Sequence, residues 1–342
     1  MKKKIFITGG AGFIGSNFAR HRILMGDQVT IFDNLSRRGA KSNLEWIRTE
    51  TSGSQFEFIK GDVRDYDHLA AVLGSHDVVV HLAAQVAVTS SVTDPAYDFG
   101  VNAAGTFNVL ESVRQSGRHP LVIYASTNKV YGEIENIAVE EEEQRYRFSD
   151  LPKGVSETQL LDFHSPYGCS KGCGDQYVRD YSRIYGFPTV VFRQSCIYGQ
   201  RQFGVEDQGW VAWFIIAAVL GQPISIYGDG KQVRDILHID DLVAAYNQAV
   251  ERVERPGGEI FNIGGGPQNA IAIWREFGPI LEEIHGKRIP ITYGNWRPGD
   301  QKIYISDISK AKQILGWEPR INVKEGIARL YRWVTENREL FA

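Results

Sequence analysis

The segment "FITGGAGFIGSNFA", residues 6–19, contains the pattern that decides the fold. A short apolar strand enters a glycine-rich turn, and a helix-like stretch follows directly. Gly10, Gly12 and Gly15 have the spacing G-x-G-x-x-G, and Gly9 precedes them. Glycine at these positions permits a tight turn, a close approach of the backbone to a ligand, and packing of helix against strand. Because the helix N-terminus presents unpaired N–H groups and a partial positive charge, the unit is expected to bind a phosphate.

An acidic residue follows at the distance that a dinucleotide fingerprint requires. The second strand-like segment, "DQVTIFDN", ends near Asp33, about 20 residues after the glycines. A carboxylate there accepts a hydrogen bond from a ribose 2′-hydroxyl and disfavours a 2′-phosphate. The pattern therefore predicts dinucleotide binding, with NAD favoured over NADP. Arg37 and Arg38 lie nearby and leave NADP open, unless they are surface residues.

Strand-like and helix-like segments alternate over the first two-thirds of the chain, which is typical of a parallel sheet covered by helices on both faces. We expect strands at residues 3–10, 27–34, 55–62, 77–84, 120–127 and 188–195, with helices such as 13–25 and 105–115 between them. Farther on we expect a helix at 211–221 and a sheet-like return over 236–250 and 258–266.

This order predicts an α/β fold: a doubly wound parallel sheet (Rossmann) with a smaller, mixed α/β C-terminal substrate domain. We expect the dinucleotide-binding domain to span 1–192, completed by 235–264. The substrate domain would then comprise 193–234 and 265–342.

Composition narrows the class of protein. The 342 residues carry a net charge of −3, which gives no basic field for nucleic acid or an anionic membrane. The opening apolar run is too short for a signal peptide. The cysteines, Cys169, Cys173 and Cys196, make neither a disulfide framework nor a metal quartet. We expect a cytoplasmic protein with no metal site and no nucleic-acid or membrane partner.

A second motif, "SPYGCSKG" at residues 165–172, places Tyr167 and Lys171 four positions apart on one face of an expected helix. A lysine ammonium near a phenol favours the phenolate. The phenolate could then take a proton from a substrate hydroxyl while hydride leaves the adjoining carbon. The spacing alone occurs by chance in many helices, but here it follows a dinucleotide fingerprint.

Together these residues resemble the extended short-chain dehydrogenase/reductases of the NAD-dependent nucleotide-sugar epimerase and dehydratase family. The resemblance covers nearly the whole chain and is carried by further motifs: "GDVRD" at 61–65, "HLAAQ" at 81–85, "NAAGTFNVLE" at 102–111, "STNKVYG" at 126–132, "VRDILHIDDL" at 233–242 and "RPGDQ" at 297–301. It implies an NAD-dependent enzyme in which Thr127, Tyr167 and Lys171 are catalytic.

The resemblance also implies the binding residues. Cofactor-binding residues would be Gly9, Gly12, Phe13, Ile14, Gly15, Asp33, Asn34, Ser36, Arg37, Asp62, Val63, Leu82, Ala83, Ala84, Gln85, Asn102, Tyr167 and Lys171. Substrate-binding residues would be Gln85, Thr127, Asn128, Lys129, Gln194, Gln202, Gln208, Arg234, Arg297 and Asp300, with the arginines on phosphate, Asp300 on ribose hydroxyls, and the glutamines on sugar hydroxyls or cytosine.

The residues at positions 128 and 129 distinguish dehydratases from epimerases in this family. The 4,6-dehydratases carry Thr-Asp-Glu before "VYG", and the two carboxyl groups drive the loss of water as acid and base. Here an amide and an amine stand in those places, so epimerisation is favoured over dehydration. An alternative is that Asn128 and Lys129 only shape the loop; even then, both carboxylates of the dehydratases are absent.

The longer strings "LDFHSPYGCSKG", "YGQRQF" and "GDGKQVRDILH" are most similar to 2-epimerases of CDP-linked dideoxysugars. This resemblance implies inversion at C2 between CDP-paratose and CDP-tyvelose, a step of lipopolysaccharide O-antigen biosynthesis, by a homodimer or higher homo-oligomer. A 4-epimerase acting on UDP-glucose and UDP-galactose remains an alternative, as does a catalytically silent NAD-binding sensor.

Overall fold

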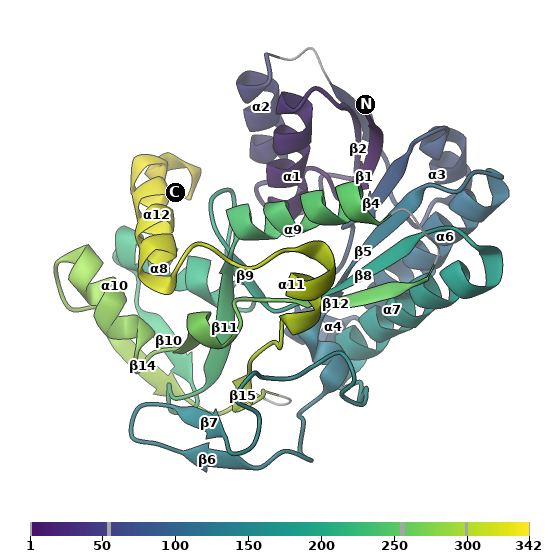
Figure 1. Cartoon of the computed structure of the whole chain (residues 1–342). Coiled ribbons are helices and arrows are strands. Elements are labelled where there is room, and N and C mark those ends of the chain that lie inside the picture. Colours follow the sequence, from purple (N-terminus) through teal and green to yellow (C-terminus); the bar gives the residue numbers. More distant parts are fainter. Residues whose placement is uncertain (1, 53–55, 254–256, 298–299, 342) are drawn as a thin grey trace. The chain divides into compact units, whose positions relative to one another are not determined.

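The computed structural model describes residues 2–52, 56–253, 257–297 and 300–341, and its elements are labelled in Figure 1. The chain divides into two compact units. The first unit contains residues 1–130, 165–193 and 243–261, and the second contains 131–164, 194–242 and 262–342. Six chain segments therefore alternate between the two units.

A seven-stranded sheet, in the order β12-β8-β5-β4-β1-β2-β3, organises the first unit. Its strands are β1 (Lys4–Thr8), β2 (Gln28–Asp33), β3 (Phe56–Lys60), β4 (Val78–His81), β5 (Leu121–Thr127), β8 (Thr189–Gln194) and β12 (Glu259–Ile263). Strands β1 to β5 pair in parallel. The order reverses between β1 and β4, which is where open α/β sheets bind ligands beyond the carboxyl ends of their strands.

Helices cover both faces of this sheet (Figure 1). They are α1 (Phe13–Leu24), α2 (Ala40–Glu50), α3 (Tyr66–Leu73), α4 (Val88–Thr93), α5 (Pro95–Phe99), α6 (Gly105–Gln115), α7 (Ser165–Tyr185) and α9 (Ile239–Arg252). Side chains of α3, α6 and α7 form one core with those of the strands, as Val109, Val122 and Val178 illustrate. On the other face Phe18 of α1 packs against Tyr246 of α9. The predicted Rossmann sheet is therefore confirmed.

The helical segment at residues 95–115 is not a regular α-helix throughout. A π-helical turn, η1 (Gly100–Ala104), joins α5 to α6 without a break. Such turns occur mostly as single insertions in α-helices and are frequent at functional sites. Asn102 lies in this turn.

The second unit is built on a mixed sheet in which β11 (Val233–His238) pairs with three strands. It is antiparallel to β13 (Ala270–Ala272) and parallel to β15 (Ile303–Tyr304) and β9 (Cys196–Tyr198). Two smaller sheets pair β10 (Ile224–Tyr227) with β14 (Ile291–Gly294), and β6 (Val139–Glu141) with β7 (Tyr146–Phe148). Its helices are α8 (Trp210–Leu220), α10 (Phe277–His285), α11 (Ser309–Leu315) and α12 (Val323–Glu336), and short 3-10 turns complete the chain at η2 (Asn128–Tyr131), η3 (Pro267–Asn269) and η4 (Arg338–Leu340).

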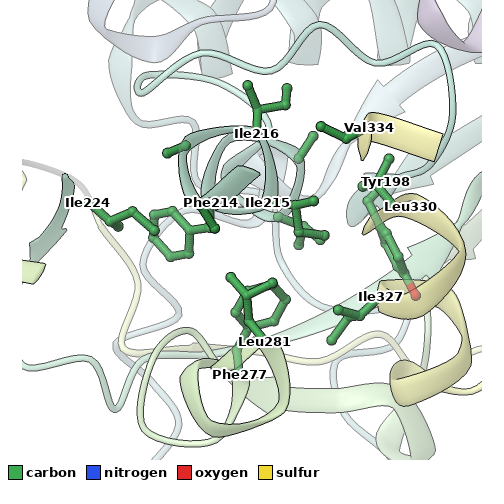
Figure 2. Packing of buried hydrophobic residues seen from close by; sticks show 14 of the residues in the cluster. Tyr198, Phe214, Ile215, Ile216, Ile224, Phe277, Leu281, Ile327, Leu330 and Val334 are labelled. Atoms are coloured by element: carbon green, nitrogen blue, oxygen red, sulfur yellow. The ribbon is translucent and has the colours of Figure 1, made fainter. Parts of the chain in front are cut away.

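The core of the second unit is separate from that of the first. Figure 2 shows Phe214, Ile215 and Ile216 of α8 packed among side chains of α10 and α12. The expected helix at 211–221 is thus confirmed, and its "WVAWF" residues contribute to this core.

Two expectations differ from the structure. Residues 239–252 form helix α9 rather than part of a sheet-like return, because Leu242, Tyr246 and Ala249 recur at helical spacing and are all buried. Residues 131–164 pack in the second unit rather than with the dinucleotide-binding segments, and β7 and Tyr146 contact residues 229 and 231 there. Pro298 and Gly299 of "RPGDQ" lie outside the described residues.

Within the described parts of the chain, no helix is both long enough and apolar enough to cross a membrane.

Candidate functional site

The glycine turn after β1 leaves no room for side chains. A Cβ on Gly15 would lie 2.4 Å from the Gly9 carbonyl oxygen, and a Cβ on Gly9 would lie 2.6 Å from the Ala83 nitrogen. Gly9 also has φ +68°, in the left-handed region that favours glycine. Gly12 is the N-cap of α1 and, within the described residues, no side chain caps that helix. The first-turn N–H groups of α1, which include Phe13 and Ile14, therefore face the turn without a side-chain acceptor.

Asp33, the last residue of β2, is hydrogen-bonded to this turn. Its carboxylate accepts hydrogen bonds from the backbone nitrogens of Ala11 at 3.0 Å and Leu35 at 2.8 Å. Burial raises the pKa of Asp33, and these two hydrogen bonds oppose that rise. The carboxylate therefore lies beside the glycine turn, at the end of β2, where the fingerprint places it. Each of its two oxygens already accepts one hydrogen bond from the backbone.

Several cofactor candidates meet at the ends of neighbouring strands. The Asn34 amide donates to Asp62 at 2.9 Å, and Arg64 pairs with the same carboxylate at 2.8 Å, which lowers the pKa of Asp62 to about 2. Val63 beside it is buried. Ser36 and Arg37 are exposed on the loop after β2. All of these positions follow β2 or β3, so the structure brings them to one edge of the sheet.

The segment after β4 is fixed by its own hydrogen bonds. Leu82 donates to the Thr8 carbonyl at 3.0 Å, and the next residues, Ala83 and Ala84, are half-buried. The Gln85 side chain accepts from and donates to the backbone of Ala87, so its amide is occupied locally. The Gln85 backbone exchanges hydrogen bonds with the Asn102 side chain at 2.9 and 3.0 Å.

Thr127 and Tyr167 are brought together although they lie 40 positions apart. Thr127 is the last residue of β5, and Tyr167 lies in the first turn of α7. The Thr127 side chain interacts with the Tyr167 phenol and opposes the rise in its pKa that burial causes. The Thr127 hydroxyl also donates to Asn128 Oδ1 at 3.3 Å and accepts from the backbone nitrogen of Lys129 at 3.2 Å. The Thr127 hydroxyl is therefore in contact with the amide of Asn128 and interacts with the phenol of Tyr167.

Lys171 follows Tyr167 by one helical turn, as predicted, and is only 4% exposed. Its ammonium lies over the Tyr124 ring, 4.2 Å from the centroid. Burial lowers the pKa of Lys171 to about 7, and the charges of Asp175 and Asp98 oppose this. Burial also raises the pKa of Tyr167 to about 12. Burial thus disfavours the charged form of both groups, and the expectation that Lys171 favours the phenolate stays a prediction.

Asn128 and Lys129 open the 3-10 turn η2 directly after β5. Asn128 is buried and Lys129 is half-buried. The side chain that meets the Thr127 hydroxyl is thus an amide, which has no proton to transfer at neutral pH.

In the second unit, Arg234 and Asp300 form an ion pair at 2.7 Å. Arg234 also donates to the carbonyls of Val233 and Gln301 and is 7% exposed. Arg297 lies over the Tyr227 ring at 4.0 Å and pairs with Asp207 at 3.2 Å. The backbone nitrogen of Asp300 donates to the Arg297 carbonyl. The two arginines therefore belong to a single charged region of this unit.

The three glutamines of the second unit that we expect to bind substrate differ in environment. Gln194 and Gln202 are buried, and Gln208 is half-buried beside α8. Gln202 donates to the Ile197 carbonyl at 3.3 Å, and its Oε1 is buried with no hydrogen-bond partner among the described residues.

Sequence reasoning missed Asp98 and Ser91, which contact the first turns of α7, and Ser170, the residue of α7 that meets Asp98. Ser91 accepts a hydrogen bond from the Tyr167 backbone nitrogen at 3.1 Å, and Ser170 donates to Asp98 at 2.5 Å. The one available signal was the four-residue spacing of Asp98 and Asn102, which gives no partner by itself.

Comparisons with known proteins show which family the chain belongs to. Residues 6–330 match the family described as GDP-mannose 4,6 dehydratase. A CDP-paratose 2-epimerase of Salmonella typhi is 43% identical over 97% of this chain and 99% of its own. The crystal structure of a UDP-glucose 4-epimerase from Thermotoga maritima with UDP-glucose has a TM-score of 0.83 and 32% identity, covering 98% of this chain and 99% of that one. A UDP-glucuronic acid 4-epimerase from Bacillus cereus, solved with UDP-glucuronic acid and NAD, has a TM-score of 0.84 and 29% identity, covering 97% and 99%. The resemblance predicted from the motifs is confirmed.

Proposed function

Because the chain belongs to the family described as GDP-mannose 4,6 dehydratase, we propose that it is an NAD-dependent nucleotide-sugar epimerase that inverts C2 of a CDP-linked 3,6-dideoxyhexose. The observation that carries this proposal is the interaction of Thr127 with the Tyr167 phenol, one helical turn from Lys171 and next to a loop that offers Asn128 rather than a carboxylate.

The described residues fit an NAD cofactor. The turn at Gly9, Gly12 and Gly15 is a cradle that any Cβ would fill, and the uncapped N-terminus of α1 suits a pyrophosphate. Asp33 would hold ribose hydroxyls, and Asp62 and Val63 would flank the adenine. When bound, NAD supplies reversible acceptance of a hydride from a sugar carbon.

Tyr167 would carry the proton that accompanies this oxidation. Its phenolate oxygen takes the proton of the sugar hydroxyl, and the phenol later returns it when the carbonyl is reduced. Thr127 would orient the reacting oxygen from the other side, since its hydroxyl already contacts the phenol. The Lys171 ammonium would stabilise negative charge on the phenol oxygen. Because Lys171 is buried, water screens this interaction little.

The loop at 128–129 favours epimerisation over dehydration. Loss of water from the sugar needs an acid and a base at neighbouring carbons. Asn128 cannot transfer a proton usefully, and Lys129 would lack an acidic partner. Arg234 and Arg297 would bind the diphosphate of the substrate, and Asp300 the nucleoside ribose.

The CDP-sugar assignment is tested with purified enzyme and no added NAD. CDP-paratose and CDP-tyvelose should interconvert, with no solvent deuterium entering the sugar carbon, because the same hydride returns. Failure to interconvert either sugar would remove the assignment. A 4-keto-6-deoxy product formed from a nucleotide-linked hexose that carries a 6-hydroxyl would indicate a dehydratase.

A 4-epimerase acting on UDP-sugars is the second candidate. The structural similarity to the Thermotoga maritima enzyme favours it. Assays with UDP-glucose and UDP-galactose separate the two, because a 4-epimerase interconverts these sugars and a dideoxyhexose 2-epimerase does not.

A further inference from the structure

The carboxylate of Asp98 lies inside the first unit although nothing in the sequence marks it as functional. It belongs to α5, is 0% exposed, and accepts two hydrogen bonds from neutral groups. Ser170 Oγ donates to one oxygen at 2.5 Å, and Asn102 Nδ2 donates to the other at 3.0 Å. An ionised carboxylate is costly to bury unless hydrogen bonds and a nearby positive charge compensate it.

The contacts of Asp98 join three segments of the site. Ser170 lies on α7 between Tyr167 and Lys171, and Asn102 lies in the π-helical turn η1. Asn102 also holds the Gln85 backbone after β4 and contacts Ser170 at 3.1 Å. The same short-helix region contacts α7 a second time, where Ser91 accepts from the Tyr167 backbone nitrogen. The first turns of α7 are therefore fixed from α4, α5 and η1.

Lys171 is a positive charge that interacts electrostatically with this carboxylate. Its electrostatic neighbours are Asp98 on α5, Asp175 on its own helix, the Tyr124 ring on β5 and, deeper, His81 on β4. Asp175 already forms a buried ion pair with Arg193 at 2.9 Å. His81 is kept neutral by burial, which lowers its pKa to about 3. Asp98, in contrast, forms no ion pair with an arginine among the residues that the structure describes.

We propose that Asp98 is a positioning residue that, through Ser170 and Asn102, fixes the turn of α7 carrying Tyr167 and Lys171 and places a negative charge near the Lys171 ammonium. The proposal rests on the proposed function for the roles of Tyr167 and Lys171. It predicts that removing the Asp98 charge impairs turnover without impairing binding of the nucleotide sugar.

The test compares Asp98→Asn with Asp94→Asn, a matched control. Asp94 is the N-cap of the same helix, and asparagine caps helices about as well as aspartate. The first readout is an NMR titration of ¹³Cε-labelled lysine, with the Lys171 signal assigned by Lys171→Arg. In Asp98→Asn the midpoint of this titration should move to lower pH, because a negative charge near the ammonium is gone.

The second readout is steady-state kinetics. We expect kcat of Asp98→Asn to fall about tenfold while KM for the nucleotide sugar stays within about twofold. Ser170→Ala, which breaks the link but keeps the charge, should lower kcat and leave the Lys171 midpoint near the wild-type value. If Asp98→Asn fails to fold, the kcat of Ser170→Ala tests the proposal instead. Because both residues act through one link, the double variant should lose little more than Asp98→Asn alone.

The titration needs no substrate, so it separates the two hypotheses. A wild-type protein that turns over no nucleotide sugar would defeat the proposed function, while the shifted Lys171 midpoint would still support the role of Asp98 toward the lysine. An unchanged midpoint in Asp98→Asn, or wild-type kcat in both Asp98→Asn and Ser170→Ala, would overturn the inference.

Discussion

The hydroxyl of Tyr167 is the atom on which the proposed chemistry depends. Replacing Tyr167 by Phe removes that oxygen and keeps the ring, so the fold and the retained dinucleotide should persist. Turnover should fall about 10²–10⁴-fold, the usual contribution of a positioned acid–base group. Kinetics together with the dinucleotide content of the purified protein measure this. Tyr177→Phe, at an exposed position of the same helix, is the control and should behave as wild type. Equal activity in Tyr167→Phe would assign proton transfer elsewhere.

His81 makes stability depend on pH. It is 1% exposed, and its ring nitrogens hydrogen-bond to the hydroxyls of Thr8 at 2.6 Å and Thr106 at 3.0 Å. Burial lowers its pKa from 6.5 to about 3, so between these values the unfolded chain binds a proton that the folded protein does not. Stability should therefore fall as the pH drops from 6.5, by about 2 kcal/mol at pH 5 from this group.

Urea unfolding at pH 7, 6 and 5 checks the effect of His81. The variant His81→Gln should show a shallower loss of stability over this range, whereas His119→Gln, at an exposed site, should keep the wild-type slope. An identical slope in His81→Gln would show that other groups set the acid sensitivity.

For individual residues, the sequence predicted which side chains lie close together but not how their pKa values are shifted. The four-residue spacing placed Tyr167 and Lys171 on one face of a helix, and the structure confirms this. Their pKa values depend on how deeply tertiary packing buries them, and no local pattern contains that information. For the same reason Asp98 was missed: its partner Ser170 lies 72 positions away.

Among the elements, the turn from β1 to α1 tolerates the least change. A methyl group at position 15 would lie 2.4 Å from the Gly9 oxygen and 2.6 Å from the Gly10 Cα, so Gly15→Ala must displace backbone. We expect a loss of about 1–3 kcal/mol in stability and weaker retention of the dinucleotide. Thermal unfolding and dinucleotide content measure both effects.

Gly257→Ala is the matched control for this turn. The nearest side-chain atom to its Cβ, Glu259 Oε1, would be 3.8 Å away, so the added methyl has space. It should unfold and retain dinucleotide as wild type does. If Gly15→Ala matched this control, the close packing at the turn would be irrelevant to binding.

Elements with a clear local period were predicted well, and those that depend on context were not. The parallel strands and α8 follow from apolar runs and helical spacing. The apolar residues of α5 and α6 recur at ordinary helical spacing. The sequence therefore gives no signal for the π-helical turn η1 between these helices. Residues 131–164 join the second unit through non-local contacts, such as that of Tyr146 with Asp229, which residue patterns do not report.

At the scale of the whole molecule, two separate cores lie on one chain that crosses repeatedly between them. Strands β8 and β12 and helix α9 each contribute residues to both units. Unfolding either unit therefore removes structured residues from elements of the other. We expect a single cooperative unfolding transition instead of two.

The tryptophans allow a direct test, because six of the seven lie in the second unit and Trp46 alone lies in the first. In a Trp46→Phe background, fluorescence reports the second unit only. Val122→Ala in the first core and Val334→Ala in the second each truncate a fully buried valine and should cost about 2 kcal/mol. If the molecule unfolds as one, both variants shift the same fluorescence transition to a similar extent. If Val122→Ala left that transition in place, the two cores would unfold independently, and the repeated crossing of the chain would not couple them.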